Sequence, residues 1–230
     1  MSRPLLVCRP QPGASATAEA AQALGIDPVV APLFDVQAVA WDPPAPDRFD
    51  ALMMTSANAA RHGGPALTRY AALPAFAVGE ATAAAMRGAG LAAVTGEGDA
   101  DALIAAIGQG PHRRVLHLCG EDFRTPAHAD LQVDAVPVYR AVAVASLSGA
   151  AITAVGRGAV VLLHSPRAAA LFARLAREAG LDTSRTSIVA ISPTAADAAG
   201  PGWRTIDAAP LPSDAAMLAI ARELCENPLR

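Results

Sequence analysis

One pattern occurs twice in the chain: an apolar run, a turn that carries a serine, and an alanine-rich segment with helical spacing. In the later copy the apolar run covers residues 159–163, Ser165 lies in the turn, and Pro166 follows it. In the earlier copy Ser56 follows the apolar run 51–54. A buried strand, a serine that caps a helix and a proline at the first helical position account for this order. The repeat therefore predicts an α/β fold with parallel strands.

The same alternation of strands and helices is predicted along the rest of the chain. Apolar runs predict five strands between residues 50 and 138, three after residue 158 and two before residue 35. In chain order these strands are 4–8, 28–34, 50–54, 75–78, 91–94, 114–118, one that ends at 138, 159–163, 187–191 and 203–206. Helices are predicted, among others, at 14–24, at 125–131 and from Ser213 to Cys225, and residues 139–144 are predicted to be an extended connector.

Short stretches from the middle of the chain reappear near its end. Ala77-Val-Gly-Glu-Ala-Thr-Ala resembles Ala190-Ile-Ser-Pro-Thr-Ala-Ala, and Asp101-Ala-Leu-Ile-Ala-Ala-Ile resembles Asp214-Ala-Ala-Met-Leu-Ala-Ile. The strand counts balance when the N-terminal strands join the C-terminal ones. We therefore predict two related three-layer α/β domains with parallel sheets, one inserted into the other and joined by a two-stranded linker. The predicted ranges are 1–36 plus 144–230 for the first domain, 45–138 for the inserted domain, and 37–44 with 139–143 for the linker.

Composition and missing motifs exclude several classes of protein. A net charge of −3 disfavours a basic surface that binds phosphates, and an aromatic content of 4% disfavours a surface on which bases stack. We therefore expect no nucleic-acid partner. The three cysteines lack C-x-x-C spacing, which disfavours a metal cluster and a disulfide framework. The chain contains no lysine, no G-x-S-x-G and no G-x-G-x-x-G, which argues against Schiff-base, hydrolase and dinucleotide-dependent chemistry. No long apolar segment is present, so we expect a cytoplasmic protein without a membrane partner.

The turns at the carboxyl ends of the predicted strands carry the candidate ligand-binding residues. Carboxyl ends of parallel strands share one sheet edge with the N-termini of the following helices, and such N-termini favour anions. Hydroxyls, backbone N–H groups and arginines at these turns suit a ligand with several carboxylates. The candidates are Arg9, Thr55, Ser56, Thr82, Gly120, Ser165, Arg167, Ser192 and Thr194. In the alternative interpretation the hydroxyls only cap helices and the arginines are solvated.

Tyr139 lies at one of the predicted crossings between the domains. A phenol can donate a proton or a hydrogen bond to a leaving hydroxyl, which makes Tyr139 the candidate catalytic residue. The alternative is an aromatic side chain that only packs against a domain. The five histidines show no metal-ligand spacing, and His164 is the one beside a candidate turn, so no metal site is expected.

Seven short motifs in this order and spacing resemble the uroporphyrinogen-III synthase family over essentially the full chain. They are Arg9-Pro, Leu52-Met-Met-Thr-Ser-Ala-Asn-Ala, Phe76-Ala-Val-Gly-Glu-Ala-Thr-Ala, Leu118-Cys-Gly-Glu-Asp, Val138-Tyr-Arg, Leu163-His-Ser-Pro-Arg-Ala-Ala and Ala190-Ile-Ser-Pro-Thr-Ala. The resemblance implies two α/β domains joined by a two-stranded linker, with the active site in the cleft between them. It also implies a monomer.

The resemblance further implies an enzyme of haem biosynthesis that needs no cofactor. Its substrate is hydroxymethylbilane, a linear tetrapyrrole that carries eight carboxylates. The terminal hydroxyl leaves as water, and the resulting azafulvene attacks the substituted position of the last ring. A spiro intermediate then opens and recloses, which inverts that ring and gives uroporphyrinogen III.

Several residues match positions that the family uses. Tyr139 matches the linker tyrosine proposed to assist departure of the hydroxyl. Hydroxyl-bearing positions of the family are matched by Ser56, Thr82, Ser165, Ser192 and Thr194. The chain departs from some members at Ala195, where they carry a second hydroxyl, which weakens the case for an essential side chain there. The alternative function is a non-catalytic, hinged two-domain protein that binds a small polycarboxylate.

Overall fold

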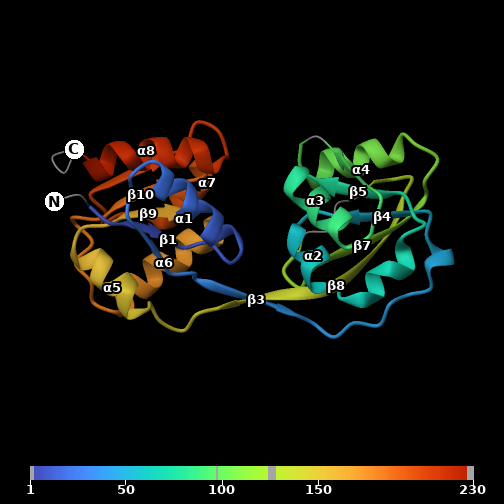
Figure 1. Ribbon diagram of the computed structural model, residues 1–230, viewed down its shortest axis with the longest axis horizontal. Coiled ribbons are helices and arrows are strands. Elements are labelled where there is room, and N and C mark those ends of the chain that lie inside the picture. The colour runs from blue at the N-terminus through green and yellow to red at the C-terminus, as the bar shows by residue number, and fades with distance from the viewer. Residues whose placement is uncertain (1–2, 97, 124–127, 227–230) are drawn as a thin grey trace. The chain divides into compact units, whose positions relative to one another are not determined.

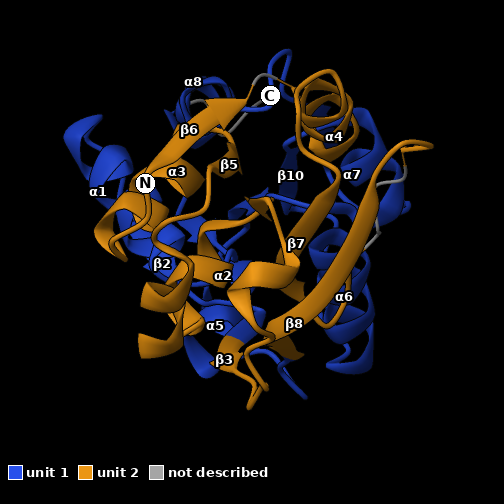
Figure 2. Cartoon of the chain, turned by 90° about the vertical axis from the view of Figure 1, so that its right-hand side faces the viewer, with its two compact units in different colours: residues 1–35, 143–230 blue, residues 36–142 orange. Residues whose placement is uncertain are grey.

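The computed structural model describes residues 3–96, 98–123 and 128–226 and separates into two compact units (Figure 1). Unit 1 consists of Met1–Asp35 and Ala143–Arg230, and unit 2 of Val36–Val142. Figure 2 shows unit 1 in blue and unit 2 in orange. Unit 2 thus interrupts unit 1 along the chain, and each unit has its own largely parallel sheet. The predicted fold class is confirmed.

The five-stranded sheet of unit 1 is parallel throughout and joins both ends of the chain. Its strand order is β11 (Thr205–Ala208), β10 (Ser187–Ala190), β9 (Val160–Leu163), β1 (Leu5–Val7) and β2 (Pro28–Val30). The central strand β9 is buried along its whole length, as expected for a parallel strand covered on both faces.

Helices cover both faces of this sheet and make three layers. On one face, α1 (Gly13–Ala23) and α8 (Asp214–Glu226) pack over alternate residues of the central strands. On the other lie α5 (Gly149–Gly156), α6 (Pro166–Glu178) and α7 (Pro193–Ala199), and Figure 1 shows α8 and α5 on opposite sides of the strands. Leu171, Phe172 and Leu175 form the buried face of α6 that their spacing predicts.

The sheet of unit 2 has six strands in the order β3 (Phe34–Ala38), β8 (Gln132–Ala143), β7 (Arg114–Gly120), β4 (Ala51–Met54), β5 (Ala75–Val78) and β6 (Ala93–Gly96). From β8 to β6 all neighbours are parallel. One face is covered by α2 (Ala57–His62), the 3-10 helix η2 (Pro65–Tyr70) and α3 (Glu80–Gly88), and the other by α4 (Ala100–Gly108). A further 3-10 turn, η1, covers Pro46–Arg48.

The two chain crossings between the units are β-strands rather than plain connectors. The Val39 N–H donates to the Val138 carbonyl and the Val144 N–H to the Leu33 carbonyl, both at 3.0 Å. Partner numbers fall along β8 as they rise along β3, so these two strands are antiparallel. The predicted connector 139–144 is therefore largely part of β8, and unit 2 gains a sixth strand. Each segment satisfies the backbone groups of the other, which two separate connectors could not do.

Other boundaries also differ from the sequence-based predictions. The predicted strand 28–34 is split into β2 and β3, and the strands predicted at 91–94 and 203–206 lie two residues later. Helix α5 was not predicted, because its start at Ser148 and Gly149 suggests a break; Ser148 instead caps it, accepting from the Ala151 N–H at 3.2 Å. Residues 125–127 of the predicted helix 125–131 lie outside the described residues. Its other residues, 128–131, form a turn instead of a helix.

A buried arginine holds the two chain segments of unit 1 together. Arg3 is 7% exposed, and its guanidinium donates to carbonyls of Gly158, Ala159, Arg185 and Leu224 and to the Ser187 hydroxyl. Burial lowers the pKa of Arg3 from its ordinary value, and nearby positive charges add to that effect. The bonds that satisfy this charge come from segments more than 150 residues away in the sequence.

We predict that Arg3→Met lowers the free energy of unfolding by about 2–4 kcal/mol, because several buried carbonyls lose their donor. Chemical denaturation measures the change. Arg174→Met is the matched control, since its exposed pair with Glu178 on α6 contributes about 0.5 kcal/mol or less. Equal effects of the two substitutions would contradict the proposed role of Arg3.

Candidate functional site

The candidate residues fall into two sets, each at the carboxyl edge of one parallel sheet. In unit 1 the turns after β1, β9 and β10 carry Arg9, Ser165 and Ser192, and the first turns of α6 and α7 carry Arg167 and Thr194. In unit 2, Thr55 and Ser56 lie in the turn after β4, Thr82 lies in the first turn of α3 after β5, and Gly120 is the last residue of β7. The register of β7 with β8 pairs Gly120 with Tyr139, so Tyr139 lies at the same edge of unit 2. Within each unit, residues far apart in the sequence are therefore brought to one edge.

Serine hydroxyls cap three helices at these edges. Ser165 Oγ accepts from the Ala168 N–H at 3.1 Å, Ser192 Oγ from the Ala195 N–H at 3.3 Å, and Ser56 Oγ from the Asn58 N–H at 3.2 Å. Capping uses one lone pair of each hydroxyl oxygen, and the O–H remains available to donate a hydrogen bond. Each cap can therefore hold its helix and still donate a hydrogen bond to an anionic group.

A charged cluster at the edge of unit 1 surrounds Asp214, the first residue of α8. Arg9 Nη1 donates to both Asp214 oxygens, at 2.8 and 2.9 Å, and the Thr17 hydroxyl donates to Oδ2. His164 Nε2 lies 3.2 Å from Oδ1. A carboxylate only accepts, so the His164 ring donates through Nε2. We call Arg9, Thr17, His164 and Asp214 the Asp214 cluster.

The electrostatics of the Asp214 cluster favour the ionised carboxylate. Burial by itself raises the pKa of Asp214, but hydrogen bonds from His164 and Thr17 and the charge of Arg9 lower it by more. The resulting pKa is about 2. The N-terminus of α8 also favours a negative charge at this position.

Arg167 and Thr194 complete the unit 1 set. The Arg167 guanidinium lies over the Phe34 ring, 4.6 Å from its centroid, which is a cation–π contact. Thr194 lies exposed in the first turn of α7. Arg9 and Arg167 are thus held differently, one by a carboxylate and the other by an aromatic face.

In unit 2, Thr55 faces a buried histidine. Thr55 Oγ1 is 3.5 Å from His117 Nε2, and His117 is 1% exposed in the middle of β7. Burial lowers the pKa of His117 to about 4, so the ring is neutral near pH 7. Thr82, in contrast, is 5% exposed within α3, and the turn before it is made by Gly79 with φ of 74°. The structure therefore exposes Ser56 and Thr55 at this edge more than Thr82.

Tyr139 packs closely on the backbone of Gly120. A Cβ placed on Gly120 would come within 2.7–3.0 Å of three atoms of the Tyr139 ring and hydroxyl, so a larger residue at position 120 would displace the Tyr139 side chain. His62, at the end of α2, lies 6.3 Å from the Tyr139 ring, centroid to centroid. Tyr139 is partly buried against the core of unit 2, and its ring packs on Gly120 at the sheet edge.

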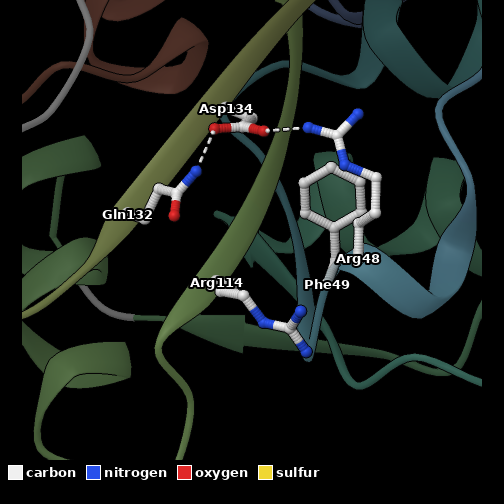
Figure 3. A pocket seen from close by; sticks show the side chains of 5 residues that line it. All are labelled: Arg48, Phe49, Arg114, Gln132 and Asp134. Atoms are coloured by element: carbon white, nitrogen blue, oxygen red, sulfur yellow. Dashed lines mark hydrogen bonds and ion pairs between the residues drawn. The ribbon is translucent and has the colours of Figure 1, made fainter.

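A small pocket of about 200 Å³ lies at the opposite, amino end of the unit 2 strands. It is lined by Arg48, Phe49, Arg114, Gln132 and Asp134, and Figure 3 shows Asp134 bonded to both Gln132 and Arg48. Its place at the amino ends of β4, β7 and β8 separates it from the candidate residues.

Among the described residues, no group of three His, Cys, Asp or Glu side chains is placed to hold a metal ion. None of the described helices has the length and apolar character needed to cross a bilayer.

Comparison with known families shows to which family the chain belongs. Residues 15–219 match the model of the family described as uroporphyrinogen-III synthase HemD. The chain belongs to the uroporphyrinogen-III synthase family. The family predicted from the seven motifs is confirmed, and with it an enzyme of haem biosynthesis; the non-catalytic binding protein is not favoured.

Solved structures of uroporphyrinogen-III synthases share the fold of the chain. The enzyme from Helicobacter pylori has a TM-score of 0.65 at 18% identity, over 96% of this chain and 99% of that one. A mutant enzyme from Thermus thermophilus has a TM-score of 0.52 at 17% identity, over 97% of this chain and 100% of that one. Among curated proteins, none matches the chain.

The sequence alone did not predict the Asp214 cluster. Arg9 and His164 stood out beside candidate turns, but Asp214 looked only like the start of a helix. Asp214 is 205 residues from Arg9 in the chain. No local pattern predicts such a pair, and Thr17 has the appearance of an ordinary helical residue.

We predict an acid-dependent stabilisation from Asp214. Its folded-state pKa of about 2 lies below the ordinary 3.8, so the carboxylate stabilises the fold above pH 3.8 and loses this effect as the pH falls toward 2. From pH 6 to pH 3, the free energy of unfolding should fall by about 1 kcal/mol more in the wild type than in Asp214→Asn. Urea denaturation at each pH measures this difference. Asp197→Asn, at an exposed position of α7, should follow the wild-type profile; parallel profiles for all three proteins would disprove the assignment.

Proposed function

We propose that the chain converts hydroxymethylbilane to uroporphyrinogen III and water, without a cofactor, with both sets of carboxyl-edge residues binding the substrate. The observation that carries this proposal is the family match over residues 15–219. The two edges support it, since each offers capped helix N-termini and hydroxyl donors to carboxylates. The eight carboxylates of the substrate suit many such weak, distributed contacts.

The catalytic step that we assign to Tyr139 is assistance to the leaving hydroxyl. As the carbon–oxygen bond breaks, the phenol donates a hydrogen bond or proton to the departing oxygen, which leaves as water. The azafulvene left behind attacks the substituted carbon of the last ring, and the spiro intermediate reopens and recloses with that ring inverted. Because Gly120 seats the Tyr139 ring against the sheet edge, the hydroxyl is held in place for this role.

The edge residues would then steer a reaction that is already easy once the hydroxyl has left. The proposed substrate-binding residues are Thr55, Ser56, Thr82 and Gly120 in unit 2, and Arg9, Ser165, Arg167, Ser192 and Thr194 in unit 1. Holding the ends of a flexible bilane in the correct geometry lowers the entropic part of the barrier.

We further propose that unit 1 corresponds to a domain of residues 1–36 plus 144–230, and unit 2 to an inserted domain of residues 45–138. Residues 37–44 and 139–143 form the proposed linker. The enzyme is proposed to work as a monomer in the cytoplasm. The even mixture of charges, with a net charge of −3, supports a protein that does not bind nucleic acid.

An isomer assay tests the proposed reaction. Freshly generated hydroxymethylbilane is incubated with and without the protein, and the products are oxidised and separated as type I and type III porphyrins. We expect type III product that depends on the protein. Type I product alone, as in the control without protein, would refute the proposed function.

We predict that Tyr139→Phe lowers turnover by about tenfold or more, since general acid assistance is lost, and leaves the unfolding midpoint unchanged. The other tyrosine provides a matched control. Tyr70 is fully buried and donates to the Pro44 carbonyl at 2.8 Å, so Tyr70→Phe should cost about 1 kcal/mol of stability and no turnover. Unchanged turnover in Tyr139→Phe would return Tyr139 to a packing role.

A further inference from the structure

Arg9 is hydrogen-bonded to described residues through only one nitrogen of its guanidinium. All its hydrogen bonds to described residues are made by Nη1, which reaches both Asp214 oxygens and lies 3.4 Å from Thr17 Oγ1. Nε and Nη2 donate to no described residue. These two nitrogens form one of the planar forks through which arginine binds a carboxylate with two parallel hydrogen bonds.

Gly13 lets the guanidinium lie against the start of α1. A Cβ at Gly13 would fall 2.6 Å from Arg9 Nε, 2.8 Å from Cζ and 3.0 Å from Nη2. Any larger residue would therefore displace the open fork. The Arg9 side chain is 33% exposed, so it packs against the backbone of Gly13 and is still accessible to solvent.

Asp214 is itself held by two further side chains. Thr17, from the middle of α1, is fully buried and donates to Oδ2. His164, whose side chain is 7% exposed, donates to Oδ1 from the turn after β9, while its buried Nδ1 meets no described partner. The carboxylate is thus fixed from α1, from the β9 turn and by its own place on α8.

We propose that Asp214 is a positioning residue for substrate binding: it holds Arg9 by Nη1 so that the Nε–Nη2 fork receives a carboxylate of the substrate. This inference rests on the proposed function, which supplies a ligand with eight carboxylates. The assignment explains why a partly buried arginine already paired with an acid lies at a ligand edge. The acid orients one side of the guanidinium and leaves the other side for the ligand.

The alternative is that Arg9 and Asp214 only tie the β1 turn to α8. The two roles differ in one measurable respect. If Asp214 acts through Arg9, removing both groups weakens binding no more than removing Arg9 alone, because energies of coupled residues do not add. If the pair only supports the fold, its removal would lower stability, and the effects of the two substitutions on ligand affinity would not be coupled.

The experiment is a double-mutant cycle with Arg9→Gln, Asp214→Asn and the combined variant. The binding probe is a bilane with methyl in place of the terminal hydroxymethyl, which keeps all eight carboxylates and cannot lose water. Its dissociation constant is measured by calorimetry, and KM and kcat for hydroxymethylbilane are measured beside it. Because this probe cannot react, binding is measured even if the wild type forms no type III product.

We expect Arg9→Gln to weaken binding of the probe about tenfold and to raise KM with little change in kcat. Asp214→Asn should weaken binding about three- to tenfold, and less than about twofold once Arg9 is Gln. Glu178→Gln is the matched control: it removes the acid of the exposed Arg174–Glu178 pair in the same unit and should change neither constant.

Two results would overturn the inference. One is additive losses in the cycle, or unchanged affinity in Asp214→Asn when Arg9→Gln is impaired. The other is absence of binding by the wild type, which would remove the ligand altogether. Binding with the expected coupling but without type III product would refute the proposed cyclisation and leave the carboxylate site of Arg9 in place.

Discussion

Parallel pairing of strands is the constraint on which both units depend. It brings the carboxyl ends of the parallel strands to one edge and requires a crossover between parallel neighbours, and where that crossover is a helix its N-terminus lies at that edge. Each N-terminus has unpaired N–H groups, and Ser56, Ser165 and Ser192 satisfy some of them. The candidate site is therefore a by-product of the fold, because any anion that reaches this edge meets several helix ends at once.

The two arginines of the unit 1 edge show how such an edge can be tuned. Arg9 is paired with an ionised carboxylate, whereas Arg167 lies over the Phe34 ring. A carboxylate partner fixes the direction of a guanidinium through hydrogen bonds, while an aromatic face restrains its plane. In unit 2 the corresponding fixing is steric: Gly120 seats the Tyr139 ring, and a neutral His117 lies beside Thr55.

Local features of the fold could be read from the sequence, and features that depend on distant partners could not. Strand, capping serine and amphipathic helix are encoded within about 20 residues, so β9 with α6, and β4 with α2, were predictable. The two crossings were predicted as a two-stranded linker, but their membership of the unit 2 sheet as β3 and β8 was not, because each segment becomes a strand only in the presence of the other. The same holds for the site. Ser165 is evident from its neighbours, but the pair of Arg9 with Asp214 spans 205 residues and has no local signal.

The interrupted order of unit 1 has a consequence for its synthesis. Gly158, which accepts from Arg3, is made 155 residues later, and β9, the neighbour of β1, follows directly. At translation rates of about 5–20 residues per second, the N-terminal strands wait roughly 8–30 s for these partners. All strands of the unit 2 sheet are complete by residue 143. The nascent chain thus completes unit 2 first, while Arg3 and the apolar strand β1 stay exposed. During this interval the protein most needs protection from aggregation.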